Sequence, residues 1–375
     1  MAIVTTKNNW INLTIWVVII ALIIAAPTFL PVFRLNLLGR YLSLAIVALG
    51  VDLIWGFTGM LSLGQGIFFA LGGYCAAMFL QLNSSEGFPN GIPEFFGLYG
   101  IEKLPFFWEP FRSSIFTLFS IWLLPAIIAG LLGYLVFRNR IKGVYFSILT
   151  QAALLVFFNF FNGQQKLING TNGLKTDVTE LFGQMVGSEI IQRWFFWLTA
   201  ILVIFAWLFS RWIVRDRFGD ILIGIRDDEP RVRFTGYNPV VFKTIIFSIA
   251  GGLAGISGAL YTVQSGIVSP QFMTVPFSIE MVIWVAVGGR GTLLGAILGA
   301  VFINYAKSLV SEALPASWMF IQGGLFIFVV TALPEGVLGW IRRGGLKELL
   351  YLIGINKKLK TYPRLEVNEQ GEVKS

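Results

Sequence analysis

Long apolar runs recur along almost the whole chain and alternate with short polar segments. Most have about 20 residues, the length that a helix needs to cross the hydrocarbon core of a bilayer. The pattern predicts an all-α, polytopic membrane protein, because a transmembrane β-barrel would instead show segments of about ten residues with alternating polarity. We expect about ten spans, at residues 11–30, 41–57, 60–82, 114–137, 144–161, 194–213, 243–264, 279–288, 292–306 and 317–340.

Two of these segments, 279–288 and 292–306, are too short to be ordinary spans. They meet at the glycine-rich sequence of residues 287–292. Interrupted segments at membrane depth are tolerated only where the backbone is buried in protein or lines a cavity. We therefore expect two short half-helices here.

The charges of the linkers predict the orientation of the chain. Residues 138–142, the linker 214–242 and the segment from Arg342 onward are basic, as cytoplasmic loops of membrane proteins are. The linkers 83–113 and 162–193 are mixed in charge and are expected outside. Alternation between the two sides then places both termini in the cytoplasm.

This organisation gives one transmembrane domain, residues 1–343, followed by a polar cytoplasmic tail, residues 344–375. Arg34 and Arg40 do not fit it, because they fall in a short linker on the outer side.

Composition supports the membrane assignment and narrows the class of function. Hydrophobic residues make up 56% of the chain and charged residues 13%, whereas soluble domains have roughly 25% charged residues. The net charge of +8 lies mostly in linkers, so we attribute it to the cytoplasmic bias of basic residues and not to binding of nucleic acid. Cys75 is the only cysteine, which leaves no disulfide framework.

The residues needed for common catalytic sites are missing from the sequence. Without histidine, the chain can form neither a Ser–His–Asp triad nor a His-Glu-x-x-His zinc site. It has no Gly-x-x-x-x-Gly-Lys-Ser/Thr motif for nucleotide binding. Residues 64–70 imitate a dinucleotide fingerprint, but they lie in an apolar segment with no preceding strand. We expect no catalytic residues, no metal site and no cofactor bound by this chain.

A few polar residues lie within the apolar segments. A charge at the centre of a membrane helix costs about 2.5–3.5 kcal/mol on insertion scales, so such residues face a bundle interior or an aqueous route. Asp52 is the most centrally placed; it either pairs with neighbouring backbone or lines the route, and Glu280 lies nearer the interface. The candidates for a translocation path are Asp52, Ser62, Gln65, Gln151, Asn159 and Asn304.

Small residues recur every four positions in two segments. Gly251 and Gly255 form one series, and Gly291, Gly295 and Gly299 form the other. This spacing lets membrane helices approach closely. It predicts tight packing within the subunit, with a subunit interface or a moving seam as the alternative.

The linker 214–242 carries signals for a short helix. Asp227 or Asp228 can cap its start, Pro230 suits its first turn and Gly236 suits its end. Residues 238–239, Asn-Pro, then cap the following membrane helix in the same way.

The side chains of this short helix favour a docking element for a soluble partner. Val232 and Phe234 are apolar and lie among Glu229, Arg231 and Arg233. The alternative is an ordinary basic cytoplasmic loop, which would need no capping signals.

The same region carries a family resemblance. Residues 219–260, extended by Ala-Gly-Gly-Leu-Ala-Gly-Ile-Ser-Gly-Ala-Leu-Tyr at 250–261, resemble the permease subunits of branched-chain-amino-acid-type ABC importers, the LivM-like group. The glycine-rich residues 287–296 and the segment 55–74 match two further motifs of that family.

Within this family the chain is most similar to the urea-type permeases. Gly143-Val-Tyr-Phe-Ser-Ile-Leu-Thr-Gln-Ala152, Gly170-Thr-Asn-Gly-Leu174 and features of the 55–74 motif carry that similarity. Gln65 stands where the urea group often has His, and Glu335 stands where Lys is common. These departures weaken the urea assignment if either position contacts substrate or a partner.

The resemblance implies a type II ABC importer fold in the bacterial inner membrane. It also implies a second, LivH-like permease subunit, two ATPase subunits that bind ATP, and an extracytoplasmic substrate-binding protein. The family's coupling segment, which transmits ATPase movement to the membrane helices, falls here on Gly224, Arg226, Asp228, Glu229, Arg231, Phe234 and Gly236.

The leading hypothesis is therefore a non-enzymatic transport subunit for urea. Import of branched-chain amino acids or short amides is the alternative within the family. A passive solute channel would need no docking helix, and a membrane enzyme would need acid–base or metal groups that the sequence lacks.

Overall fold

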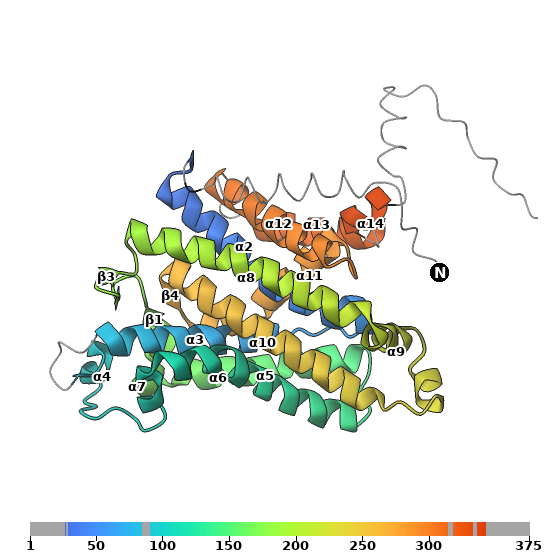
Figure 1. Cartoon of the computed structure of the whole chain (residues 1–375), viewed down its shortest axis with the longest axis horizontal. Coiled ribbons are helices and arrows are strands. Elements are labelled where there is room, and N and C mark those ends of the chain that lie inside the picture. Colours follow the sequence, from blue (N-terminus) through green and yellow to red (C-terminus); the bar gives the residue numbers. More distant parts are fainter. Residues whose placement is uncertain (1–26, 28, 85–90, 314–317, 333–335, 343–375) are drawn as a thin grey trace, which may run out of the picture.

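The computed structural model describes residues 27, 29–84, 91–313, 318–332 and 336–342 as an elongated helical bundle (Figure 1). Both termini, most of the expected first span 11–30, the tail 344–375 and Glu335 lie outside the described residues. Seven described helices are long and apolar enough to cross a membrane. They are α2 (Val32–Thr58), α3 (Gln65–Ser84), α5 (Ser114–Arg138), α6 (Val144–Gly163), α8 (Glu189–Arg215), α10 (Pro239–Ser265) and α12 (Leu294–Ala313).

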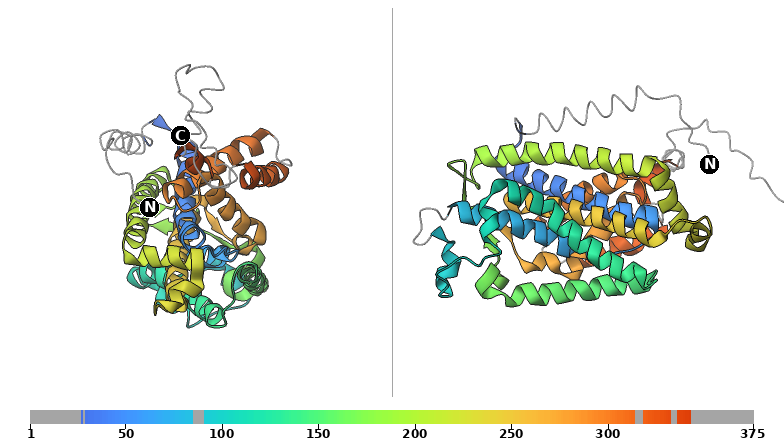
Figure 2. Two further views of the ribbon diagram at one scale, coloured as in Figure 1. Left: turned by 90° about the vertical axis from the view of Figure 1, so that its right-hand side faces the viewer. Right: turned by 60° about the horizontal axis from the view of Figure 1, so that its bottom comes forward.

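Shorter elements complete the described chain. Four further helices are α9 (Arg217–Phe234), α11 (Val275–Gly288), α13 (Trp318–Ala332) and α14 (Gly336–Arg342). Small elements gather mostly at the end of the bundle that lies farthest from α9 (Figures 1 and 2). They are α4 (Glu94–Leu98), α7 (Gln165–Ile168), η3 (Glu109–Arg112), η4 (Gly170–Asn172), η5 (Pro270–Met273), β1 (Leu174–Lys175), β2 (Glu180–Leu181), β3 (Gln184–Met185) and β4 (Ile267–Val268).

Helix α10 lies at the centre of the packing and contacts α2, α3 and α5. Helices α8 and α12 pack on α2. Most side chains of α2 and α3 are buried, whereas α5, α6 and α8 keep long apolar faces exposed, as helices in contact with lipid do. These faces include Ile115, Leu118, Phe119, Leu131, Val156, Phe160, Trp194, Ile201, Phe205 and Trp212.

The expected start of the second span, at residue 41, is wrong. Helix α2 begins at Val32 and not at residue 41, so Arg34 and Arg40 lie on a helix rather than in a short outer linker. Arg34 forms an ion pair with Glu312, and Arg40 donates to the carbonyl oxygen of Gln264. Both arginines therefore have partners in distant parts of the chain. The charge pattern of the linkers could not indicate such long-range pairing.

The glycine-rich interruption at residues 287–292 is confirmed, but only one of its neighbours is a short helix. Helix α11 has 14 residues, whereas α12 has 20 and is a full-length candidate span. The expected half-helix 292–306 is therefore wrong, because α12 continues through the polar residues up to Ala313.

An irregular segment, residues 59–64, separates α2 from α3, although the hydropathy pattern predicts two nearly continuous spans there. Gly59 ends α2 in a left-handed conformation, with φ of 75°. Side chains of α6 bind the irregular backbone: Ser147 Oγ donates to the Leu61 carbonyl at 2.6 Å, and Leu63 N donates to Thr150 Oγ1 at 3.0 Å. Non-helical backbone is stable here because side chains of α6 form hydrogen bonds with its carbonyl and N–H groups.

Candidate functional site

Helix α9 consists of two helical parts that meet at a kink. Asp228 has non-helical dihedral angles, with φ of −155° and ψ of 86°, and its Oδ1 accepts from Arg231 N at 3.1 Å. Asp228 therefore caps the second part, and Gly236 follows with φ of 88°. These predicted caps are confirmed, as is the cap of α10 by Asn238, which accepts from Val240 N. The first part of α9, before the kink, was not predicted.

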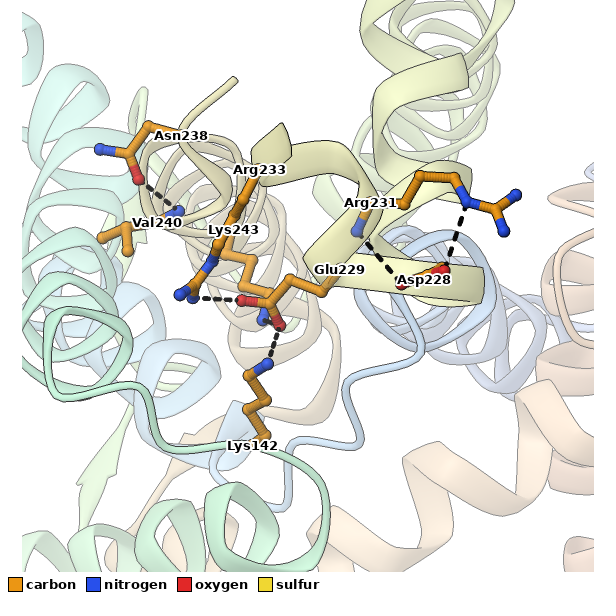
Figure 3. Close-up of polar contacts among 8 residues, drawn as sticks. All are labelled: Lys142, Asp228, Glu229, Arg231, Arg233, Asn238, Val240 and Lys243. Atoms are coloured by element: carbon orange, nitrogen blue, oxygen red, sulfur yellow. Dashed lines mark hydrogen bonds and ion pairs between the residues drawn. The ribbon is translucent and has the colours of Figure 1, made fainter. Parts of the chain in front are cut away.

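Glu229 is the centre of an ionic cluster that joins three parts of the chain (Figure 3). Its Oε2 lies 2.6 Å from Lys243 Nζ on α10 and 3.2 Å from Lys142 Nζ, which precedes α6. Its Oε1 lies 2.7 Å from Arg233 on α9. Burial would raise the pKa of Glu229, but the bonds from Lys243, Lys142 and Arg233 outweigh it and hold the pKa below its usual value.

The burial of Glu229 corrects its expected place on the docking surface. The residue is 9% exposed and its carboxylate is occupied by protein cations. Glu229 therefore positions α9 on the bundle. Its sequence position, between Asp228 and Pro230, gave no signal of this contact with α10.

Pro230, Arg231 and Phe234 are exposed in the second part of α9, and we call Arg231 and Phe234 the α9 tip. Phe234 is 92% exposed, although it is large and apolar. The Arg231 side chain is 82% exposed and pairs only loosely with Asp228, at 3.4 Å. Val232, by contrast, packs against Gly224 in the first part of α9. A Cβ added at Gly224 would lie 3.1 Å from Val232 Cγ2. Of the two predicted apolar knobs, Phe234 is fully exposed and Val232 is partly buried.

The first part of α9 is attached to the end of α2. Arg226 donates from its guanidinium to the Gly56 carbonyl oxygen at 2.9 Å. Its Nε also lies 3.0 Å from Asp227 Oδ1. Movement of α9 would therefore act directly on the last turn of α2.

One turn before Gly56, Asp52 binds the glycine-rich segment that precedes α12. Its Oδ1 accepts from Gly291 N at 2.6 Å, and its Oδ2 accepts from Leu293 N at 2.9 Å. Gly56 allows this close approach, because a Cβ there would lie 2.6 Å from Gly291 N. A continuous set of contacts thus runs from α9 through α2 to the start of α12, and it gives Asp52 the backbone pairing that was one of its two predicted roles.

Replacing Asp52 by asparagine is expected to lower both stability and transport. Two backbone donors face the carboxylate, and the amide of asparagine offers only one acceptor, so one charge-assisted hydrogen bond of about 1.5–3 kcal/mol is lost. The thermal unfolding of the purified transporter measures this loss. Ser43→Ala is the matched control, because Ser43 is buried in the same helix and its hydroxyl donates to the Arg40 carbonyl oxygen of that helix. An Asp52→Asn protein with wild-type stability and uptake would contradict this role.

The other candidates for a translocation path do not form one cluster of contacts. Ser62 is buried in the irregular segment before α3 and Gln65 is buried at the start of α3, where its amide has no hydrogen-bond partner within the described residues. Gln151 is half-buried. Asn159 is exposed on α6 and bonds to Leu155, and Asn304 bonds to Ala300 of its own helix. Their role as a path stays a prediction.

The two glycine series pack helices within the described subunit. A Cβ at Gly251 would lie 2.4 Å from Ala129 Cβ of α5, and one at Gly255 would lie 2.3 Å from the Ile121 carbonyl oxygen. Gly295 and Gly299 approach Gly288 of α11 in the same way. Gly291 instead lies beside Gly56. These contacts agree with the packing interpretation of both series.

Comparison with known proteins adds independent information. The profile of the family described as "Branched-chain amino acid transport system / permease component" matches residues 33–330. No solved structure matches the chain.

Individual relatives are permeases by name. The high-affinity branched-chain amino acid transport system permease protein LivM of Salmonella typhimurium is 26% identical over 318 residues, which covers 79% of this chain and 68% of the relative. LivM of Escherichia coli K12 is 27% identical with the same coverage. The autoinducer 2 import system permease protein LsrC of Salmonella choleraesuis is 31% identical over 144 residues, or 36% of this chain and 40% of the relative.

Proposed function

Because the chain belongs to the family of branched-chain amino acid transport system permease components, we propose that it translocates urea as the membrane subunit of an ATP-driven importer in the bacterial inner membrane. ATP would bind to two ATPase subunits and not to this chain. A second, LivH-like permease would complete the pathway, and an extracytoplasmic binding protein would deliver the solute.

The α9 tip is the observation that carries the ATP-driven mechanism. A phenylalanine with 92% exposure beside an exposed arginine, on a capped helix that is anchored by Glu229, suits docking to a soluble protein. Aromatic residues, phenylalanine included, and arginine are enriched at protein–protein interfaces relative to the rest of the surface. A passive solute channel would need no docking helix, so the presence of this helix disfavours a passive channel.

Urea is favoured over a zwitterion because the acidic residues at membrane depth are already paired within the protein. The Asp52 carboxylate is taken up by two backbone amides, and Glu280 forms an ion pair with Lys307. An amino acid needs charged partners for both its carboxylate and its ammonium group, whereas a neutral amide needs only hydrogen bonds. The motifs at residues 143–152 and 170–174 support the same solute. The names of the LivM relatives make branched-chain amino acids the second candidate.

Deletion of the gene is expected to abolish high-affinity urea uptake. The measurement is uptake of labelled urea and of labelled leucine at low external concentration, in the deletion strain and in the strain complemented with the full chain. Loss of urea uptake with unchanged leucine uptake supports the proposal. Loss of leucine uptake with unchanged urea uptake would replace urea by branched-chain amino acids.

A further inference from the structure

A cavity of about 390 Å³ lies where helices α5 and α10 reach the end of the bundle that carries α9 (Figure 1). Its wall is formed by the last turn of α5 and the turn that follows it, by the end of α9 and by the first residues of α10. Both α5 and α10 are candidate membrane spans, so the cavity lies at the depth where a bilayer presents its headgroups. The charge pattern assigns this end of the bundle to the cytoplasm.

Three arginines line this cavity, which we call the arginine cavity. They are Arg138, Arg140 and Arg233, and none of the described residues that form the wall is acidic. Arg140 has a left-handed backbone conformation, with φ of 58°, so the chain turns directly after α5 and Arg140 lines the same wall as Arg138. The cavity therefore gathers positive charge from two separate parts of the chain.

This positive charge is not balanced within the described part of the chain. Neither Arg138 nor Arg140 forms an ion pair there. Arg233 bonds to Glu229, but two lysines share that carboxylate, so three cations face one anion. Like charges at such short range repel one another, and an anion in the cavity would relieve that repulsion.

The surroundings of the arginine cavity favour a lipid over a soluble anion. Tyr134 and Tyr237 belong to its wall, Arg138 lies over the Tyr134 ring, and tyrosine is typical of the membrane interface. The seam between α5 and α10 leads from the cavity into the membrane-spanning part, where Ser248 Oγ donates to the Ala126 carbonyl oxygen at 2.7 Å. Exposed apolar side chains flank this seam and present a surface for acyl chains: Leu123 and Ile127 on α5, and Val241 and Ile245 on α10.

We propose that Arg138, Arg140 and Arg233 bind the headgroup of an anionic phospholipid, whose acyl chains lie along the seam between α5 and α10. Guanidinium groups donate paired hydrogen bonds to phosphate oxygens, and basic cavities between membrane helices on the cytoplasmic side suit such headgroups. The volume lies within the range of small-molecule sites. The bound lipid joins α5 to the end of α9, and this inference does not depend on which solute the protein carries.

Binding of lipid to the purified, complete importer tests the site without a transport assay. The importer in detergent is titrated with phosphatidylglycerol or with phosphatidylcholine, and the bound lipid is counted by native mass spectrometry. In a third titration, glycerol 3-phosphate competes with phosphatidylglycerol, because it carries the phosphate without acyl chains. The variant replaces Arg138 and Arg140 by glutamine and leaves Arg233 intact, since that residue also bonds to Glu229.

We expect this double variant to bind phosphatidylglycerol several-fold more weakly than the wild type, with phosphatidylcholine binding unchanged. Glutamine at both Arg211 and Arg215 is the matched control. These arginines are exposed at the same end of the bundle and do not line the arginine cavity. Arg211 also lies over an aromatic ring, that of Trp207, as Arg138 does. The control loses the same charge and should bind phosphatidylglycerol as the wild type does.

An equal loss of phosphatidylglycerol binding in both double variants would overturn the site, because the net charge of this surface would then explain the attraction. Displacement of phosphatidylglycerol by an equal concentration of glycerol 3-phosphate would overturn the lipid and assign the cavity to a soluble phosphate. Unchanged phosphatidylglycerol binding in the Arg138 and Arg140 variant would also overturn the proposal. Simultaneous loss of the ATPase subunits from that variant would then assign the cavity to an acidic surface of a partner.

Discussion

Replacing Glu229 by alanine is expected to remove most of the transporter from the membrane and to abolish uptake. The change leaves Lys243, with a side chain 7% exposed, beside Lys142 and Arg233 without a counter-charge. Removal of one partner from a buried ion pair costs about 3–5 kcal/mol, which is a large part of the stability of a domain. Lys142 and Arg233 are more exposed, so water screens their share of the interaction.

Two matched variants separate this effect from a general loss of charge. Asp227→Ala removes an acid whose side chain is 63% exposed on the same helix, and we expect nearly wild-type stability. Replacing both Glu229 and Lys243 by methionine should restore the amount of protein in the membrane relative to Glu229→Ala, because the buried cation is removed and the remaining cations, Lys142 and Arg233, are partly exposed to water. Thermal unfolding of the purified complex is the measurement. Wild-type stability of Glu229→Ala would show that the cluster does not anchor α9.

The low pKa of Glu229 gives this cluster a defined pH dependence. A carboxyl group with a lower pKa in the folded state binds fewer protons there than in the unfolded state, so stability rises with pH through that interval. The contribution of Glu229 is complete above the usual pKa of a glutamate and is lost as pH falls through the folded-state value. Glu229→Gln should therefore flatten the acid side of the stability profile.

Replacing Arg231 and Phe234 together by alanine is expected to uncouple transport while the chain still folds and inserts. Neither side chain supports the bundle: Phe234 is 92% exposed, and Arg231 makes one loose surface pair. If they contact an ATPase, loss of such an interface centre costs about 2 kcal/mol or more. That corresponds to an uptake lower by more than about tenfold. Uptake, ATPase activity and the amount of assembled complex are measured on the same preparation.

Phe182→Ala is the matched control for the α9 tip. Phe182 is equally exposed, at 91%, but lies at the opposite end of the bundle, so ATPase coupling should be unchanged. Normal uptake with normally stimulated ATPase in the Arg231 and Phe234 variant would contradict docking at this tip. The second part of α9 would then be an ordinary polar connection between α8 and α10.

Features of this protein with a local physical cause could be predicted from the sequence. Apolar runs of span length predicted the membrane helices, because burial of twenty consecutive residues in lipid depends on composition alone. Asp228, Gly236 and Asn238 were predicted as helix boundaries, because a cap is formed between residues that are neighbours in the chain. The interruption of the helices at residues 287–292 could likewise be predicted, because it depends on the glycines of that segment itself.

Other features were decided only by tertiary structure. Asp52 binds backbone donors 239 and 241 positions away, and Glu229 binds Lys243 across a turn that reverses the chain. The three arginines of the arginine cavity come from α5, from the turn that follows it and from α9. Periodicity and capping describe interactions within a few residues, whereas the pairing of a buried polar group depends on which distant segment packs against it. The sequence alone therefore determined a helical membrane protein with a capped polar helix, and the packing of those helices decided which of its polar residues are buried anchors and which are exposed.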